Sequence, residues 1–199
     1  MTETARIGRP VPDVVAEAYM RGEPQPRRVS PASFRGRWLV LFFYPRDFSR
    51  VCPTELQAFA QLYPEFVRER AAVVGVSTDS YDAHKAWFET DSRLAEVAYP
   101  VVADSTHEMS AAFGVLQEDG SALRGTFIVD PEGLVRAVHL NDPDVGRNVQ
   151  ETLRLLRALR TGELCPEGWT PGQATLSPHP TPVTAPDPGR TGWLPGVPG

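Results

Sequence analysis

The chain has 199 residues, of which 41% are hydrophobic and 23% charged, an ordinary composition for a globular protein. This length suits one domain with a full hydrophobic core and a short appendage. Twenty basic and 25 acidic residues give a formal charge of -5, which argues against a nucleic-acid-binding surface or an anionic membrane partner.

Neither a secretory signal nor a membrane span is predicted. Residues 1–6 lack the apolar core of a signal sequence. The longest uninterrupted apolar run covers residues 38–44 and is far too short to cross a bilayer. We therefore expect a cytoplasmic protein.

Two buried strands and the helix between them are predicted in the first half of the chain. Residues 38–43 and 72–77 are short, apolar and rich in β-branched or aromatic side chains, which is typical of buried strands. Apolar spacings of three and four predict a helix from Pro53 onward, with a kink at Pro64. A second helix is predicted over residues 82–89.

The second half continues the alternation of strands and helices. A third helix is predicted near residues 105–113, and residues 126–129 and 134–139 should form a hairpin. The last helix is expected over about residues 144–160. This order predicts an α/β domain with a mixed sheet. Four apolar side chains of the last helix should be buried: Val149, Leu153, Leu156 and Leu159.

The composition changes towards the C-terminus. Residues 175–199 contain seven prolines and four glycines, and such a segment resists regular structure. It is either an extended arm on another surface or disordered. We expect one domain over residues 1–172, which includes a distinct segment at 161–172, followed by a tail at 173–199.

The chain contains only two cysteines, Cys52 and Cys165. In a cytoplasmic protein they are either inert buried thiols or redox-active groups, because structural disulfides are rare there. Cys52 lies between a predicted strand and a helix that starts with Pro53, a residue suited to the first helical position. Free backbone N–H groups and the helix dipole favour an anion there. A thiolate nucleophile would also need a cation nearby.

Residues Pro45, Ser49 and Cys52 follow the spacing Pro-x-x-x-Ser-x-x-Cys, which resembles the active-site motif of peroxiredoxins. The flanking Phe-Phe-Tyr-Pro and Val-Cys-Pro-Thr-Glu-Leu are similar to the typical 2-Cys peroxiredoxins, which include the catalytic subunit of bacterial alkyl hydroperoxide reductase. The resemblance covers about residues 5–172. It implies a thioredoxin-like fold, with a central mixed β-sheet flanked by helices, a peroxiredoxin-type N-terminal extension and a C-terminal arm.

The resemblance also implies a thiol-dependent peroxidase and a role for each matching residue. Cys52 would be the peroxidatic nucleophile. Arg124, in Leu-Arg-Gly-Thr-Phe-Ile-Val-Asp-Pro, would stabilise its thiolate and the transition state. Ser49 would donate a hydrogen bond to the peroxide, and Pro45 would shield the site from water. Glu55 would orient the arginine. A structural role alone accounts for this residue almost as well, because the helix dipole favours a carboxylate in the first turn.

Cys165 lies beyond the last predicted helix, in Leu-Cys-Pro-Glu-Gly-Trp. This is similar to the resolving-cysteine motif of the family, with Leu164 in place of valine. The resemblance implies that Cys165 condenses with the sulfenic acid of Cys52 across an antiparallel homodimer. Disulfide-bonded Cα atoms must lie within about 7 Å, so both segments would unwind locally during turnover.

The substrates implied are hydrogen peroxide and organic hydroperoxides, with thioredoxin, another dithiol donor or a flavoprotein reductase as the electron donor. The assembly would be a dimer or a decamer of dimers. No cofactor is expected, because the four histidines lack metal-ligand spacing and no phosphate-binding glycine motif occurs.

Two other functions compete with a peroxidase. A general thiol–disulfide oxidoreductase usually has a Cys-x-x-Cys pair, which is missing here. The other is a chaperone-like or redox-sensing oligomer with little turnover. Cys52→Ser would abolish peroxidase activity but would spare a purely structural function.

Overall fold

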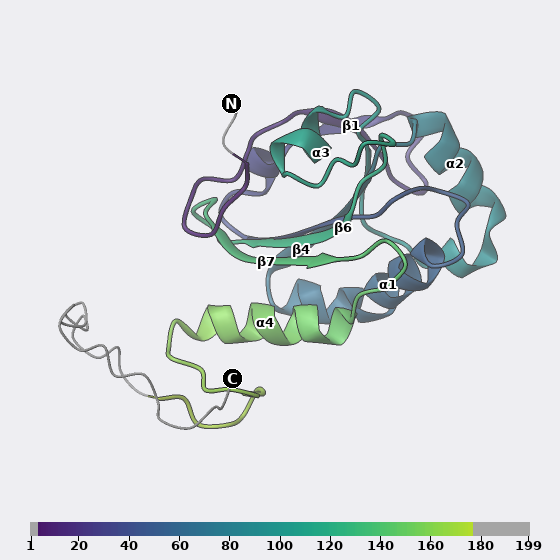
Figure 1. Cartoon of the computed structure of the whole chain (residues 1–199). Coiled ribbons are helices and arrows are strands. Elements are labelled where there is room, and N and C mark those ends of the chain that lie inside the picture. Colours follow the sequence, from purple (N-terminus) through teal and green to yellow (C-terminus); the bar gives the residue numbers. More distant parts are fainter. Residues whose placement is uncertain (1–3, 177–199) are drawn as a thin grey trace, which may run out of the picture.

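The computed structural model describes residues 4–176 and contains a seven-stranded mixed β-sheet (Figure 1). The strand order across the sheet is β2-β1-β5-β4-β3-β6-β7. The strands are β1 (Ala16–Tyr19), β2 (Arg27–Val29), β3 (Trp38–Phe43), β4 (Ala71–Ser77), β5 (Val101–Ala103), β6 (Arg124–Val129) and β7 (Val135–Asn141). Strands β3, β4 and β5 run parallel, and the other neighbours in the sheet are antiparallel.

The central strand β3 has a hydrophobic core on each of its faces, which explains its uninterrupted apolar sequence. Val40 and Phe42 point into one core, whereas Leu39, Leu41 and Phe43 point into the other. Because successive side chains of a strand alternate between faces, a strand buried on both sides needs apolar residues at every position. This strand was therefore predicted with its observed boundaries.

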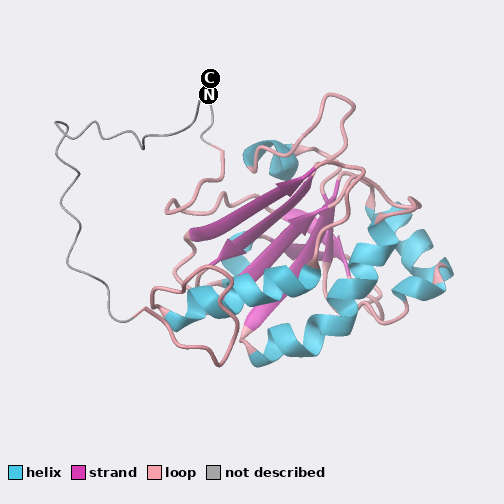
Figure 2. Cartoon of the chain, turned by 60° about the horizontal axis from the view of Figure 1, so that its bottom comes forward, coloured by secondary structure: helices cyan, strands magenta, loops and turns pink. Residues whose placement is uncertain are grey.

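Helices cover both faces of the sheet. The α-helices are α1 (Cys52–Arg68), α2 (Tyr81–Thr90), α3 (Glu108–Ala112) and α4 (Val149–Thr161), and short 3-10 turns cover Pro31–Phe34 and Ser92–Leu94. Helices α1 and α4 lie on one face, with α3 on the opposite face (Figure 1). The turned view shows helices crossing in front of the strands (Figure 2). The expected central mixed sheet flanked by helices is confirmed.

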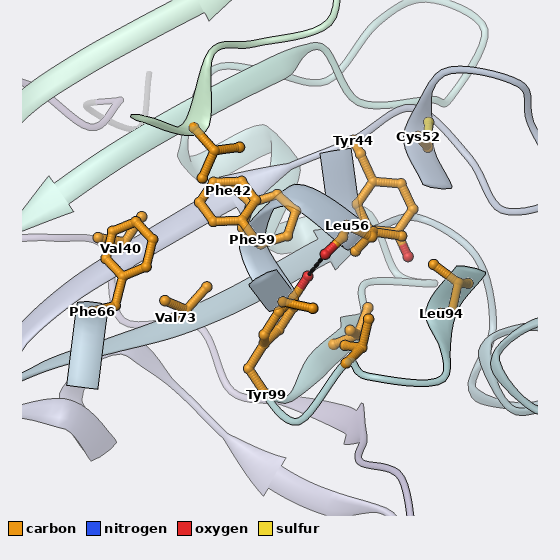
Figure 3. Packing of buried hydrophobic residues seen from close by; sticks show 14 of the residues in the cluster. Val40, Phe42, Tyr44, Cys52, Leu56, Phe59, Phe66, Val73, Leu94 and Tyr99 are labelled. Carbon is orange, nitrogen blue, oxygen red and sulfur yellow. Dashed lines mark hydrogen bonds between the residues drawn. The ribbon is translucent and has the colours of Figure 1, made fainter. Parts of the chain in front are cut away.

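Aromatic side chains pack α1 onto the sheet (Figure 3). The rings of Phe42 and Phe59 stack with their centroids 4.1 Å apart. The buried Tyr99 hydroxyl donates a hydrogen bond to the Leu56 carbonyl oxygen at 2.8 Å. Stacked aromatic pairs contribute about 1 kcal/mol beyond the area they bury. These contacts fix α1, and with it Cys52 at its first residue, relative to the end of β3.

Several predicted boundaries were wrong. Helix α4 begins at Val149 and not near residue 144, because the Asn148 side chain accepts the Glu151 backbone N–H as an N-cap. The third helix starts only at Glu108, because His107 has a left-handed backbone conformation. Helix α1 begins at Cys52, one residue earlier than predicted, so Pro53 is its second residue.

Three strands, β1, β2 and β5, were not predicted. Each has only three or four residues, too few for a period-two pattern to stand out. Strands β1 and β2 form an antiparallel pair before β3, in the region of the expected N-terminal extension.

Of the expected tail at residues 173–199, only residues 173–176 are among the described residues. Within it, the Leu176 backbone N–H donates to the Leu164 carbonyl at 2.8 Å. None of the helices among residues 4–176 combines the length and hydrophobicity needed to cross a membrane.

Gly125 in β6 gives a test of the packing. A Cβ atom at this position would lie 2.8 Å from Val115 Cγ1 and 3.1 Å from Phe127 Cε2. We expect Gly125→Ala to lower the unfolding free energy by about 1–3 kcal/mol in urea denaturation, because the packed core cannot move aside. Gly146→Ala is the control, with a nearest neighbour at 3.4 Å and an expected change within about 0.5 kcal/mol. Equal stability of the two variants would contradict this account.

Candidate active site

Cys52 is the first residue of α1 and is fully buried. The helix starts in the segment that follows β3, at the carboxyl end of the parallel strands. The backbone N–H groups of Thr54 and Glu55 already turn back to the Val51 carbonyl. The sulfur therefore lies at the positive end of the helix dipole, as the sequence predicts.

Arg124 is the first residue of β6 and is buried beside this sulfur. Its Nη1 lies 3.4 Å from Cys52 Sγ, within hydrogen-bond distance for sulfur, although the two residues are 72 positions apart. Its Nε donates to the Pro143 carbonyl at 2.7 Å, which holds the guanidinium in place. Antiparallel pairing of β6 with β3 brings the two residues together.

Glu55 lies one turn into α1 and joins two buried arginines. Arg124 Nη1 donates to Glu55 Oε2 at 2.5 Å, and Arg147 Nε donates to Glu55 Oε1 at 2.8 Å. The Arg147 backbone N–H also donates to Glu55 Oε1 at 2.8 Å. The carboxylate therefore does more than complement the helix dipole, because it binds both guanidinium groups directly.

Arg147 was not predicted as a site residue. Its Nη1 donates to the Gly125 carbonyl at 3.0 Å, and its Nη2 donates to the Phe43 carbonyl. Its guanidinium also lies 5.2 Å from the centre of the Phe42 ring, a cation–π distance. Burial lowers the pKa of Arg147 below its ordinary value, and the Glu55 carboxylate opposes that shift. A single arginine in a polar loop gives no sequence signal of burial.

Ser49 and Pro45 lie in the segment between β3 and α1. The Ser49 hydroxyl oxygen is buried and has no hydrogen-bond partner among the described residues. Pro45 is buried as well. A buried hydroxyl without a partner costs free energy, so this donor is available to a bound ligand.

A buried polar cluster holds this segment in place. Asp47 accepts hydrogen bonds from the Tyr44 hydroxyl at 2.8 Å and from His84 Nδ1 at 2.6 Å. The other ring nitrogen of His84 lies 3.1 Å from the Val102 carbonyl. Desolvation raises the pKa of Asp47, and His84 opposes that rise. Desolvation and the adjacent Asp47 also raise the pKa of Tyr44.

Cys165 lies apart from this cluster. Its half-buried sulfur is 3.7 Å from the Ala158 carbonyl and 3.5 Å from the Thr161 hydroxyl, at the end of α4. Cys165 lines a cavity together with Trp38, the first residue of β3. Cys52 follows the other end of β3, so the two free cysteines of one chain lie at opposite ends of that strand.

Two family models match parts of this chain. The AhpC/TSA family model matches residues 7–138. A model described as the C-terminal domain of 1-Cys peroxiredoxin matches residues 158–186, a segment that includes Cys165.

Curated relatives and solved structures match most of the chain. A putative peroxiredoxin of Synechocystis is 43% identical, covering 90% of this chain and 94% of that protein. Peroxiredoxin-2 of Bos taurus is 43% identical, and the match covers 88% of this chain and 91% of that protein. The reduced 2-Cys peroxiredoxin of Plasmodium vivax superposes with a TM-score of 0.81 at 30% identity, covering 85% of this chain and 91% of that chain. AhpC of Mycobacterium tuberculosis gives a TM-score of 0.76 at 38% identity, covering 84% of this chain and 99% of that chain.

The structural matches confirm the thioredoxin-like fold that the sequence predicts. The sequence and structural matches together establish the family. The chain belongs to the AhpC/TSA family and is a peroxiredoxin, a thiol-dependent peroxidase.

Proposed function

We propose that Cys52 reduces hydrogen peroxide and organic hydroperoxides, and that Cys165 of the partner subunit then resolves the oxidised sulfur. The observation that carries this proposal is the Arg124 guanidinium, held 3.4 Å from a buried sulfur at a helix N-terminus. Glu55 neutralises only one of the two guanidinium charges around it. A thiolate at Cys52 would balance the remaining positive charge.

The first step is a displacement on the peroxide. The Cys52 thiolate attacks one peroxide oxygen, the S–O bond forms and the O–O bond breaks. The sulfur becomes a sulfenic acid, and the departing oxygen leaves as water or an alcohol after taking a proton. Arg124 stabilises the negative charge that develops on the oxygens, and the free hydroxyl of Ser49 orients the peroxide. Pro45 keeps water away.

The second step forms a disulfide between subunits. The thiol of Cys165 of the partner subunit attacks the Cys52 sulfenic acid, and water leaves as the S–S bond forms. The geometry within one chain supports a partner as the source, because β3 separates the ends where the two cysteines lie. Its six residues span about 20 Å, far beyond the reach of a disulfide. The buried Cys52 must also leave its helical position locally.

The cycle closes when a dithiol donor reduces the disulfide. We assign this role to thioredoxin, a similar dithiol protein or a flavoprotein reductase, acting on a homodimer or on a decamer built from dimers. We assign the cycle to the cytoplasm, where reductants keep thiols available.

Separate cysteine variants test the two steps. Cys52→Ser should abolish peroxide consumption, because the sulfur that the Arg124 guanidinium contacts is lost. Cys165→Ser should still complete one turnover but should form no disulfide-linked dimer. Stopped-flow peroxide assays and non-reducing gels, run with thioredoxin as the donor, would measure both. A disulfide within a single chain of the wild type, or cycling by Cys165→Ser at the wild-type rate, would contradict the intersubunit mechanism.

Ser49→Ala tests the role of the free hydroxyl. We expect kcat/KM for peroxide to fall about tenfold, because a donor to the peroxide is lost. Stability should not fall, since the hydroxyl has no partner among the described residues.

Ser110→Ala is the matched control, because its hydroxyl is also buried without a partner in that part of the chain. It lies in α3, on the other face of the sheet. An equal fall in kcat/KM for both variants would exclude a specific contact between Ser49 and the peroxide.

Glu55→Gln tests the positioning of the arginines. The change leaves two buried guanidinium groups without their carboxylate and should lower the unfolding free energy by about 3 kcal/mol. It should also lower kcat/KM for peroxide about tenfold or more, since Arg124 keeps its bond to the Pro143 carbonyl but loses the ionic partner of Nη1.

Glu65→Gln is the control on the same helix, where the carboxylate pairs with Arg68 and Arg157 near the surface. The variant should lose much less stability than Glu55→Gln and keep the wild-type rate, because exposed ion pairs contribute little. If Glu55→Gln lowers stability but leaves the rate at the wild-type value, Glu55 has only a structural role.

A further inference from the structure

A cavity of about 480 Å³ opens at the end of the sheet remote from Cys52. It lies where β3 and β4 begin and where α1 ends, and the β2 strand forms another wall. Helix α1 has 17 residues, so about 25 Å separates this cavity from the sulfur at the other end of the helix. The peroxidase mechanism makes no use of this cavity.

Arginines dominate the charge of the cavity wall. Arg27, Arg28, Arg37 and Arg70 line it, and no acidic residue does. Arg27 pairs with Glu23 at 2.5 Å. The other three have no carboxylate within salt-bridge distance among residues 4–176. Three arginines without a salt-bridge partner among residues 4–176 therefore line one hollow in a chain whose net charge is -5, with Glu17 opposite Arg28 in the β1–β2 register.

Two of these arginines are held side by side by the sheet. The register pairs Trp38 of β3 with Ala71 of β4, and the Trp38 N–H donates to the Arg70 carbonyl at 3.2 Å. Arg37 and Arg70 each come directly before one residue of this pair, so their backbones lie next to each other at the same end of the sheet. Like charges on adjacent strands repel each other, and an anion between them would remove that repulsion.

Arg70 also has a backbone conformation that does not suit it. It follows Glu69, the C-cap residue of α1, with a φ of 53°, a left-handed position where glycine is the unstrained choice. The arginine therefore costs backbone strain at a place where it contributes charge to the cavity. Strain of this kind is a signature of functional positions.

The remaining wall of the cavity is apolar apart from Ser33. Phe34, Tyr63, Val67 and Pro100 contribute to it, and Val67 is 54% exposed although it is apolar. The Arg37 guanidinium lies 5.5 Å from the centre of the Phe34 ring, so one arginine already stacks on this wall. The cavity volume is in the range of small-molecule sites, which combine apolar walls with a few charged groups.

We propose that this cavity binds an organic phosphate that carries a planar ring, the class to which nucleoside diphosphates and triphosphates belong. The forked guanidinium donors of Arg28, Arg37 and Arg70 match phosphate oxygens. The ring would lie on the apolar wall formed by Phe34 and Tyr63. Such a site needs no glycine-rich phosphate loop, because side chains provide the donors.

The test is isothermal titration calorimetry of the reduced full-length protein with ATP, ADP, adenosine and tripolyphosphate, without magnesium. ATP and ADP should bind with one site per chain. Adenosine, which lacks phosphate, and tripolyphosphate, which lacks the ring, should each bind at least about tenfold more weakly. Equal affinity for ATP and tripolyphosphate would exclude the ring as part of the ligand. Absence of ATP binding at millimolar concentration would exclude the site.

Arg70→Gly separates binding from folding. It removes the charge and the strained backbone together, so ATP affinity should fall about tenfold to a hundredfold while the melting temperature rises. Arg68→Ser removes the same charge two positions away, from a residue that does not line the cavity and pairs with Glu65. Its ATP affinity should stay within about twofold of the wild type. If both variants weaken ATP equally, only the general positive field attracts the nucleotide.

Discussion

The Glu55 carboxylate, buried between two guanidinium groups, is the interaction on which the active site depends. Removing charged groups from water costs several kcal/mol for each ion, and this cost is offset only when every charge has close partners. Glu55 receives hydrogen bonds from Arg124 and from both the side chain and backbone of Arg147. One positive charge remains, and it faces Cys52 at 3.4 Å.

The same carboxylate also ties together segments that are far apart in the chain. Arg147 donates to the carbonyls of Phe43 in β3 and Gly125 in β6, so its guanidinium closes the end of the sheet beside the reactive helix. This end carries the carboxyl terminus of β3, where ligand sites of α/β folds are commonly found. A core that is apolar on both faces of β3 can therefore carry polar groups at that end of the sheet, where Glu55 gives both buried guanidinium groups a close partner.

The sequence could predict what depends on local pattern. The apolar run at residues 38–43 predicts the buried strand β3, and Pro53 predicts a helix start beside Cys52. The roles of Arg124 and Glu55 were predicted from the resemblance to a family motif. Arg147 was missed because a buried charge is set by partners distant in sequence. The start of α4 was predicted too early, because the Asn148 side chain caps the helix at that point and the apolar spacing does not show such a cap.

The two cysteines lie at opposite ends of helix dipoles. Cys52 begins α1, at the positive end of that dipole, and its sulfur lies 3.4 Å from Arg124 Nη1. Cys165 lies against the last turn of α4, where its S–H donates to the Ala158 carbonyl at 3.7 Å. The proposed nucleophile therefore lies beside a hydrogen-bond donor, whereas the sulfur proposed to resolve it lies beside an acceptor. Under the proposed mechanism, movement of Cys165 away from α4 towards a partner subunit would break this hydrogen bond to the Ala158 carbonyl.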